Sequence, residues 1–367
     1  MKIGILKETK PGEKRVALSP TVAGQLIKNG FEVLVESGAG TASSFEDPVY
    51  ETAGVKVVSD KSQLISEADV VAKVNPFADD EIAQLKNGQI IFSLMYHLSN
   101  PELIQKLNGK GVSAFSMDAI PRISKAQSMD VLSSQSNLAG YKAVLLGANQ
   151  MTKIFPLMMT AAGTIIPSKV LIFGIGVAGL QAIATAKRLG AQVEATDVRP
   201  ETKEQAESLG AKFIEVKSDG VKAEGGYARE VSEEYQQKQK EAVNKSLSQA
   251  DLVITTALIP GRKAPVLITE EQVKLMKYGA VIVDMAAEQG GNCEIAKADE
   301  IVFKHGVYVI GTTNLPSTLA TNASELYAKN LSTFLQYLAT KDGFKWEMEE
   351  EITKGTLICH GGNILKS

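Results

Sequence analysis

The sequence predicts an α/β fold built from two doubly wound domains with a cleft between them. Three observations support this prediction. Short β-branched runs alternate with helical patterns in the first third of the chain, a similar series follows Pro167, and only the second series contains a glycine-rich turn. Alternating βα units form parallel sheets that helices cover. With 367 residues, 44% of them hydrophobic, the chain is long enough for two separate cores.

The first series predicts six strands and the helices that cover them. One helix is marked by Ser19, a good N-cap, and by Pro20 at the first helical position, and Gly30 ends it. The expected strands are Lys2–Leu6, Glu32–Glu36, Val55–Val58, Ala68–Val74, Gln89–Leu94 and Val112–Met117.

The second series predicts another doubly wound domain. Before it, the segment from Ser134 to Met151 has no proline and repeats apolar residues at helical spacing, so it predicts a connecting helix. Another helical pattern runs from Leu319 to Leu338. The expected strands are Lys169–Phe173, Gln192–Thr196, Ala211–Val216, Asp251–Thr255, Ala280–Asp284 and Val307–Ile310.

The C-terminal tail predicts a small hairpin that packs back on the first domain. Its arms are Thr356–Ile358 and Asn363–Leu365, and Gly361 and Gly362 form the turn. The expected domain bounds are therefore residues 1–132 together with 328–367 for the first domain. Residues 133–327 form the second.

Composition argues against several classes of function. A net charge of −3 gives no electrostatic reason to expect nucleic acid as a partner. Cys293 and Cys359 stand far apart and in no metal-ligand spacing, which argues against a disulfide scaffold or a zinc site. The first residues are too polar for a signal peptide. The uncharged run Val170–Ala186 contains three glycines, and it predicts a strand, turn and helix instead of a membrane span.

The glycine-rich turn has the pattern of a Rossmann-like dinucleotide site. Gly174, Gly176 and Gly179 follow a predicted strand and open a predicted helix. The first glycine permits the tight turn, the second lets a pyrophosphate approach the backbone, and the third lets the helix pack closely on the strand. The amides of Val177 and Ala178 belong to the helix N-terminus, which attracts phosphate. Alternatively, the glycines shape only a turn.

An acidic residue at the end of the next strand predicts a preference for NAD over NADP. Asp197 follows Gly179 by 18 residues, where a carboxylate accepts hydrogen bonds from the adenosine ribose and repels a 2′-phosphate. Arg199 complicates this preference, because a nearby arginine can accommodate a 2′-phosphate. Alternatively, Asp197 only caps the following helix.

A long polar segment gives a resemblance to a known family. Met117–Tyr141 closely resembles the NAD-binding component of proton-translocating NAD(P) transhydrogenases. The resemblance continues through Met158–Thr164, the glycine-rich turn, Thr255–Gly261 and Glu288–Asn292, and so covers nearly the whole chain.

This resemblance implies a catalytic set over the nicotinamide, at the cleft. The set is Arg122, Gln127, Asp130 and Ser133. The chemistry agrees, because hydride exchange between two nicotinamides needs distance, angle and exclusion of water, but no general acid or base. Without the family, Arg122 and Asp130 could form an ordinary salt bridge between domains.

The resemblance also implies the residues that contact NAD(H). Between Val216 and Asp251 a long polar insertion contains Tyr227, which matches the tip of a mobile loop in similar subunits; a solvated loop with no such role is the alternative. The expected contacts are Gly174, Gly176, Val177, Ala178, Gly179, Asp197, Val198, Arg199, Tyr227, Thr256, Ala257 and Leu258.

Partners and location follow from the same resemblance. It implies a homodimer and separate subunits that span the membrane and bind NADP(H), since the sequence shows no spanning segment. The chain would be cytoplasmic, peripheral on the inner face of the bacterial cytoplasmic membrane through those partners. No nucleic acid and no direct membrane insertion are expected.

Alanine dehydrogenases share the two-domain plan and are the competing interpretation. Arg15 and Lys73 could hold a carboxylate or keto oxygen, and His97 could transfer a proton. Glu288 departs from that pattern, because alanine dehydrogenases have aspartate before Gln-Gly-Gly. The alternative is that Lys73 and His97 are strand-end residues satisfied by their neighbours. A third hypothesis is a non-catalytic protein that senses NAD.

Overall fold

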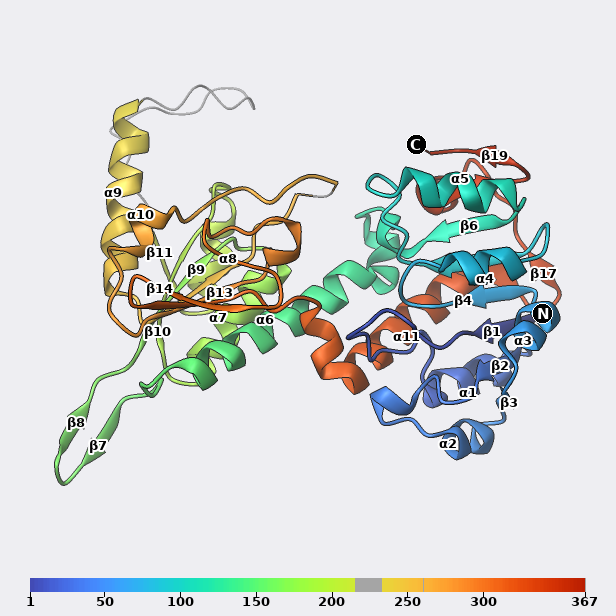
Figure 1. Cartoon of the computed structure of the whole chain (residues 1–367), viewed down its shortest axis with the longest axis horizontal. Helices are drawn as coiled ribbons and strands as arrows, with labels where there is room; N and C mark the ends of the chain where they lie inside the picture. The colour runs from blue at the N-terminus through green and yellow to red at the C-terminus, as the bar shows by residue number, and fades with distance from the viewer. Residues whose placement is uncertain (215–232, 260, 367) are drawn as a thin grey trace. The chain divides into compact units, whose positions relative to one another are not determined.

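The computed structural model describes residues 1–214, 233–259 and 261–366. Tyr227 lies outside the described residues. The chain divides into two compact units, one of residues 1–135 with 316–367 and one of residues 136–315. The first division falls within helix α6 (Val131–Gln150), and the second precedes helix α11 (Ala320–Leu338). The expected bound at 327/328 falls inside α11. Both chain termini lie on the first unit, unit 1 (Figure 1).

Unit 1 contains an eight-stranded sheet in the order β19-β18-β6-β5-β4-β1-β2-β3. All six predicted strands are present. The strands are β1 (Lys2–Ile5), β2 (Glu32–Glu36), β3 (Lys56–Val58), β4 (Val70–Ala72), β5 (Ile90–Ser93), β6 (Ser113–Ser116), β18 (Leu357–His360) and β19 (Asn363–Ile364). The C-terminal hairpin also forms as predicted, and β18 joins the sheet antiparallel to β6, so the tail packs on the first domain. The sheet is therefore mixed.

Helices cover both faces of the unit 1 sheet. Strand β4 shows the alternation, since Val70 and Ala72 enter one core and Val71 enters the other. The first core includes side chains of α1 and α11, and the second includes those of α3, α4 and α5. The helices are α1 (Pro20–Lys28), α2 (Asp47–Thr52), α3 (Lys61–Glu67), α4 (Asp79–Gln84), α5 (Pro101–Gly109), α11 and α12 (Glu351–Thr356).

Unit 2 contains a seven-stranded sheet in the order β11-β10-β9-β12-β13-β15-β14. The six strands predicted from the sequence are parallel, and the unpredicted β14 pairs antiparallel at one edge. The strands are β9 (Lys169–Phe173), β10 (Gln192–Thr196), β11 (Lys212–Phe213), β12 (Leu252–Thr255), β13 (Val281–Asp284), β14 (Ile301–Lys304) and β15 (Val307–Ile310). The covering helices include α7 (Val177–Arg188), α8 (Thr202–Ser208), α9 (Glu233–Gln249) and α10 (Glu270–Val273).

Two smaller features were not predicted as strands. A hairpin of β7 (Met158–Thr160) and β8 (Gly163–Ile165) extends away from the sheet of unit 2 (Figure 1). In unit 1, β16 (Ala339–Thr340) pairs with β17 (Gly343–Phe344). The run Val170–Ala186 forms β9, a turn and most of α7, as expected. Within the described ranges, no helix is long and apolar enough to cross a membrane.

Candidate functional site

The glycine-rich turn lies at the carboxyl end of β9, where the strand order of unit 2 reverses. β9 pairs with β10 on one side and with β12 on the other, so chain segments leave in two directions from this point. Crevices at such positions are where open α/β sheets bind their ligands. The turn joins β9 to α7, whose N-cap is Gly176, and no side chain caps this helix end. The amides of the first helical turn are therefore available to an anion.

The three glycines have different surroundings. Gly174 has a φ of +89°, and a Cβ there would lie 2.6 Å from the Thr256 hydroxyl. A Cβ on Gly179 would lie 1.9 Å from the carbonyl oxygen of Gly174, so only glycine lets α7 approach the turn. A Cβ on Gly176 would meet nothing within 4 Å. Gly176 thus faces open space, and the fold does not itself require glycine at this position.

Asp197 follows β10 and contacts the same turn. Its Oδ2 accepts hydrogen bonds from the Ile175 amide at 2.6 Å and from Arg199 Nη2 at 2.9 Å. Its Oδ1 accepts from the Arg199 amide at 2.9 Å and from Arg199 Nε at 3.0 Å. Burial by itself raises the pKa of Asp197, but the hydrogen bonds from Arg199 and Ile175 outweigh it and hold the pKa below its ordinary value. The group is a carboxylate at neutral pH.

These four contacts fill the acceptor positions of the carboxylate. Ribose hydroxyls can reach Asp197 only by replacing the Arg199 side chain, which is half exposed and free to move. The Ile175 contact involves backbone and would remain. The neighbouring Val198 is 91% exposed, as expected of a side chain that a ligand covers.

The segment after β12 completes the rim of this site. Thr256 donates its hydroxyl to the carbonyl oxygens of Gly174 at 3.0 Å and Phe173 at 3.2 Å. Ala257 and Leu258 follow, and Leu258 is half exposed. The predicted cofactor-binding residues of unit 2 that the structure describes therefore gather around one end of one sheet. Open space over Gly176, uncapped amides and an adjacent carboxylate fit a dinucleotide.

The predicted catalytic residues lie on the segment that leads into α6, within unit 1. Asp130 accepts hydrogen bonds from the amide and hydroxyl of Ser133, at 2.9 Å and 2.6 Å. Arg122 and Gln127 are exposed, and Arg122 forms no ion pair with Asp130 in the described structure. The structure therefore joins Asp130 to Ser133, and the sequence-based pairing of Arg122 with Asp130 is absent here.

The same segment is anchored in the core of unit 1. Ala126 and Met129 are buried on either side of the exposed Gln127. Asn330 of α11 donates to the carbonyl oxygen of Ser128 at 2.8 Å and accepts from the Ser134 hydroxyl at 2.7 Å. These contacts fix the backbone between Ser128 and Ser134. The sequence analysis missed Asn330, because nothing in a helical pattern marks an asparagine whose side chain faces a distant segment.

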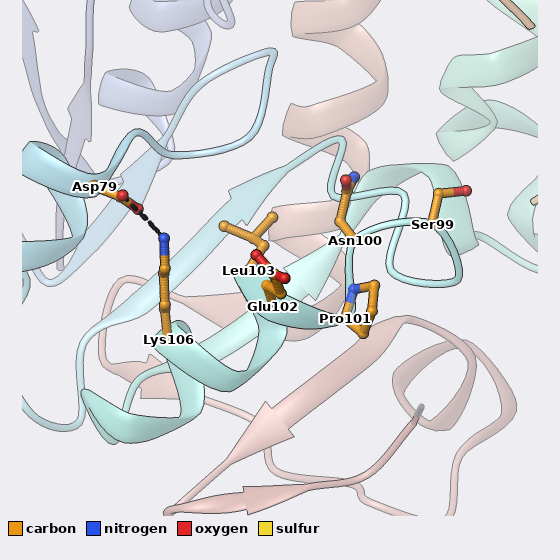
Figure 2. A pocket seen from close by; sticks show the side chains of 7 residues that line it. All are labelled: Asp79, Ser99, Asn100, Pro101, Glu102, Leu103 and Lys106. Carbon is orange, nitrogen blue, oxygen red and sulfur yellow. Dashed lines mark hydrogen bonds and ion pairs between the residues drawn. The ribbon is translucent and has the colours of Figure 1, made fainter.

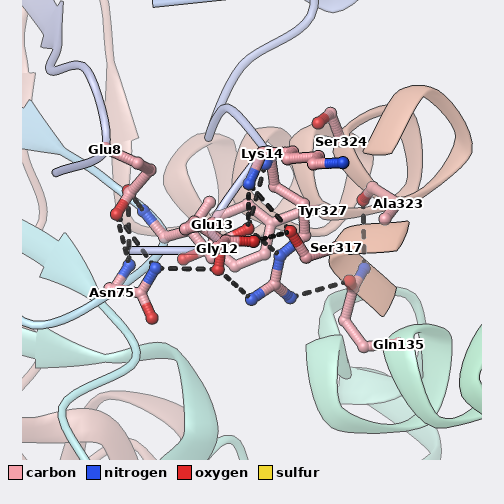
Figure 3. Close-up of polar contacts among 12 residues, drawn as sticks. Glu8, Gly12, Glu13, Lys14, Asn75, Gln135, Ser317, Ala323, Ser324 and Tyr327 are labelled. Atoms are coloured by element: carbon pink, nitrogen blue, oxygen red, sulfur yellow. Dashed lines mark hydrogen bonds and ion pairs between the residues drawn. The ribbon is translucent and has the colours of Figure 1, made fainter. Parts of the chain in front are cut away.

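A buried polar network surrounds Arg15 in unit 1 (Figure 3). Glu13 accepts from Arg15 Nε at 2.8 Å and Nη2 at 2.7 Å, and Gln135 accepts from Nη1 at 2.9 Å. Burial raises the pKa of Glu13, but Arg15 outweighs this effect and lowers the pKa to about 2. All three guanidinium nitrogens are engaged, so a substrate carboxylate would have to displace Glu13.

Lys73 lies on the other face of the sheet from Arg15. Its Nζ contacts Glu81 at 3.0 Å and 2.7 Å, and both side chains are buried. Lys73 follows Val71 by two residues and so points toward the core that contains α3 and α4. Gln135, which holds Arg15, contacts Ala323 of α11 instead. Arg15 and Lys73 therefore do not form one carboxylate site, and the structural alternative for Lys73 is supported.

His97 is half-buried and follows β5. Its buried Nδ1 has no hydrogen-bond partner among the described residues. Burial lowers the pKa of His97, and the nearby Asp118 carboxylate opposes that effect. The imidazole is therefore neutral at pH 7.

A separate surface hollow lies beside the start of α5 (Figure 2). Lys106 and Asp79 close one end with an ion pair of 2.7 Å. None of the residues predicted to bind or react lines it. The lining residues are Asp79, Ser99, Asn100, Pro101, Glu102, Leu103 and Lys106.

Comparison with known families covers both units. The family model described as alanine dehydrogenase/PNT, N-terminal domain, matches residues 4–139, and the one described as alanine dehydrogenase/PNT, C-terminal domain, matches residues 143–367. The chain belongs to the alanine dehydrogenase/PNT family. The predicted α/β fold and the family resemblance are confirmed.

Within the alanine dehydrogenase/PNT family, transhydrogenase subunits are more similar to this chain than an alanine dehydrogenase is. An NAD(P) transhydrogenase alpha subunit of Rhodospirillum rubrum is 52% identical, over 100% of this chain and 98% of the relative. The solved transhydrogenase of Sinorhizobium meliloti is 46% identical with a TM-score of 0.91, covering 99% and 100%. Alanine dehydrogenase of Bacillus subtilis is 34% identical over 90% and 86%.

Proposed function

We propose that this chain is the NAD(H)-binding component of a proton-translocating NAD(P) transhydrogenase. It would exchange a hydride directly with NADP(H) bound on a partner subunit, while the partners move protons. The observation that carries the proposal is the full-length similarity to a transhydrogenase alpha subunit, in a chain whose glycine-rich turn has the geometry of a dinucleotide site. The enzyme is active only when its partners are present.

The adenosine half of NAD(H) would be held by the residues after β10. Asp197 accepts the ribose hydroxyls once Arg199 swings away, and Val198 covers the adenine. The diphosphate lies over Gly176, against the amides of Val177, Ala178 and Gly179. Thr256, Ala257 and Leu258 bind the other half. A 2′-phosphate would meet the carboxylate of Asp197, which favours NAD(H).

The segment before α6 would orient the nicotinamide. Bound NADH supplies the hydride, and no proton leaves oxygen or nitrogen, so the residues act by position and charge. Gln127 would hold the carboxamide, and Arg122 and Asp130 would respond to the charge of the oxidised ring. Ser133 holds the Asp130 carboxylate in place through its hydroxyl.

A second copy of the chain is the partner proposed for the β7–β8 hairpin. Both strands of this hairpin are exposed, and Met159 is 77% exposed. A projecting two-stranded arm with apolar side chains cannot bury them against its own unit, and exposed apolar patches of this kind mark protein contacts. The membrane-spanning and NADP(H)-binding subunits are the other partners, and they would hold the chain at the inner face of the cytoplasmic membrane.

A titration of Asp197→Ala with NADH tests the proposed binding site. Loss of a hydrogen bond to a charged group costs about 1.5–3 kcal/mol, so the Kd for NADH should rise about tenfold or more. Glu204→Ala, which removes an exposed carboxylate from the neighbouring α8, is the matched control. An equal Kd in the Asp197 variant and in the parent chain would remove the ribose assignment.

Alanine dehydrogenase activity is the alternative that the family leaves open. The closed ion pairs of Arg15 with Glu13 and of Lys73 with Glu81 argue against it. Purified chain incubated with pyruvate, ammonia and NADH should oxidise no NADH. Steady NADH oxidation by the chain alone would favour the alternative.

A further inference from the structure

We propose that Asn292 is a positioning residue for the half of NAD(H) that lies beyond the diphosphate. The inference rests on the proposed function and names the residue that holds the Thr256–Leu258 segment in its binding shape. Asn292 is fully buried, comes from the loop after β13, and cannot contact a ligand itself. It acts through Ala257.

The place of that segment follows from the strand order of unit 2. Asp197 follows β10, on one side of β9, and Thr256–Leu258 follow β12, on the other side. A dinucleotide that crosses the carboxyl ends of these strands has its adenosine at Asp197 and its diphosphate at the β9 turn. The remaining half therefore extends toward the β12 segment.

The Asn292 side chain binds the backbone of this segment as a neighbouring strand would. Its Oδ1 accepts from the Ala257 amide at 3.0 Å, and its Nδ2 donates to the Ala257 carbonyl at 2.9 Å. Nδ2 also donates to the carbonyl of Pro265 at 2.8 Å. One amide group thus satisfies three backbone groups at the point where β12 has already ended.

The Asn292 backbone is held just as firmly. The Leu267 and Ile268 amides donate to its carbonyl at 2.7 Å and 3.0 Å. Beside it, the buried Asp284 at the end of β13 accepts from the Cys293 amide at 2.7 Å and the Ala286 amide at 2.9 Å. The preceding Gly291 has a φ of +80°, which lets the loop turn toward Ala257. Asn292 is therefore a fixed support, and the segment that it supports is at the surface.

The chemistry requires an amide at this position. A carboxylate of the same shape accepts from the Ala257 amide but presents oxygen to the carbonyls of Ala257 and Pro265. Two acceptors at such a distance repel each other, and buried polar groups without partners are costly. Serine is too short to reach all three groups. Either change releases the Ala257 backbone while leaving the β9 turn and Asp197 untouched.

The test compares two ligands in Asn292→Asp and Asn292→Ser. NADH spans the whole site, whereas 5′-AMP reaches only the Asp197 side and the phosphate at the β9 turn. We expect the Kd for NADH to rise about tenfold or more in both variants, and the Kd for 5′-AMP to stay within about twofold. Asn244→Asp makes the same change in unit 2 at a half-buried contact with Gln272, and it should alter neither Kd.

Two outcomes overturn the inference. Unchanged NADH binding in both variants shows that the Ala257 contacts do not matter for the ligand. Equal loss of NADH and 5′-AMP binding, or failure of both variants to fold, shows that Asn292 serves the fold as a whole. A parent chain that binds neither ligand refutes the proposed function itself.

Discussion

Replacing Gly176 with alanine separates the needs of the ligand from those of the fold. The Gly176 φ is −92°, a value that alanine adopts without strain, and a Cβ there meets no atom of the chain within 4 Å. The substitution should therefore leave the fold intact. The added methyl would occupy the space that a diphosphate needs.

The expected magnitudes differ widely for stability and for binding. Alanine in place of an N-cap glycine costs a few tenths of a kcal/mol to about 1 kcal/mol, and the reduced freedom of the unfolded chain returns about 0.4–1 kcal/mol. The free energy of unfolding should change by less than about 0.5 kcal/mol. A diphosphate displaced from the amides of α7 loses charge-assisted hydrogen bonds, so the Kd for NADH should rise about tenfold to a hundredfold.

Urea unfolding and NADH titration of the same samples measure both effects. Gly179→Ala is the contrasting variant, since its methyl would lie 1.9 Å from the Gly174 carbonyl oxygen. That overlap should destabilise unit 2 by about 3 kcal/mol or more. Equal NADH affinity of Gly176→Ala and the parent chain would refute the placement of the diphosphate over Gly176.

Three further predictions concern unit 1 and the hairpin. The pKa of Glu13 is lowered from 4.5 to about 2, so its contribution of about 3 kcal/mol is present above pH 4.5 and is lost as pH falls toward 2. Urea unfolding should show that Glu13→Gln loses about this amount at pH 7 and is less sensitive to acid; equal pH profiles would contradict the Arg15 pairing. Asn330→Asp should slow hydride transfer more than it weakens NADH binding, as judged by kcat and Kd, and equal effects on both would count against a positioning role. Met159→Asp should shift the chain from dimer to monomer in light scattering, and an unchanged mass would exclude the hairpin as the contact.

Much of the fold was predictable because its signals are local. The apolar runs that became β4 and β9 are buried on both faces, and such strands need no partner to be recognised. The edge strand β14 was missed, since its exposed Ile301 and Phe303 show no buried face. The β7–β8 hairpin was missed for the same reason, because its side chains have no core in their own unit.

The candidate site was predictable where backbone geometry restricts the sequence. Gly174 and Gly179 could be assigned because a positive φ and a close approach each exclude other residues. Side-chain partners were not predictable. Sequence could not show that Arg199 occupies Asp197, that Lys73 and Arg15 point to opposite faces, or that Asn292 binds Ala257. These facts depend on segments that only the fold brings together.

The central claim is that hydride passes from this chain's NADH to a nucleotide on another subunit. The most direct measurement follows reduction of an NADP⁺ analogue by NADH, with the chain alone and with an NADP(H)-binding transhydrogenase subunit added. Reduction only in the presence of the partner is the predicted result. Equal reduction without the partner, or none with it while NADH is bound, would contradict the account.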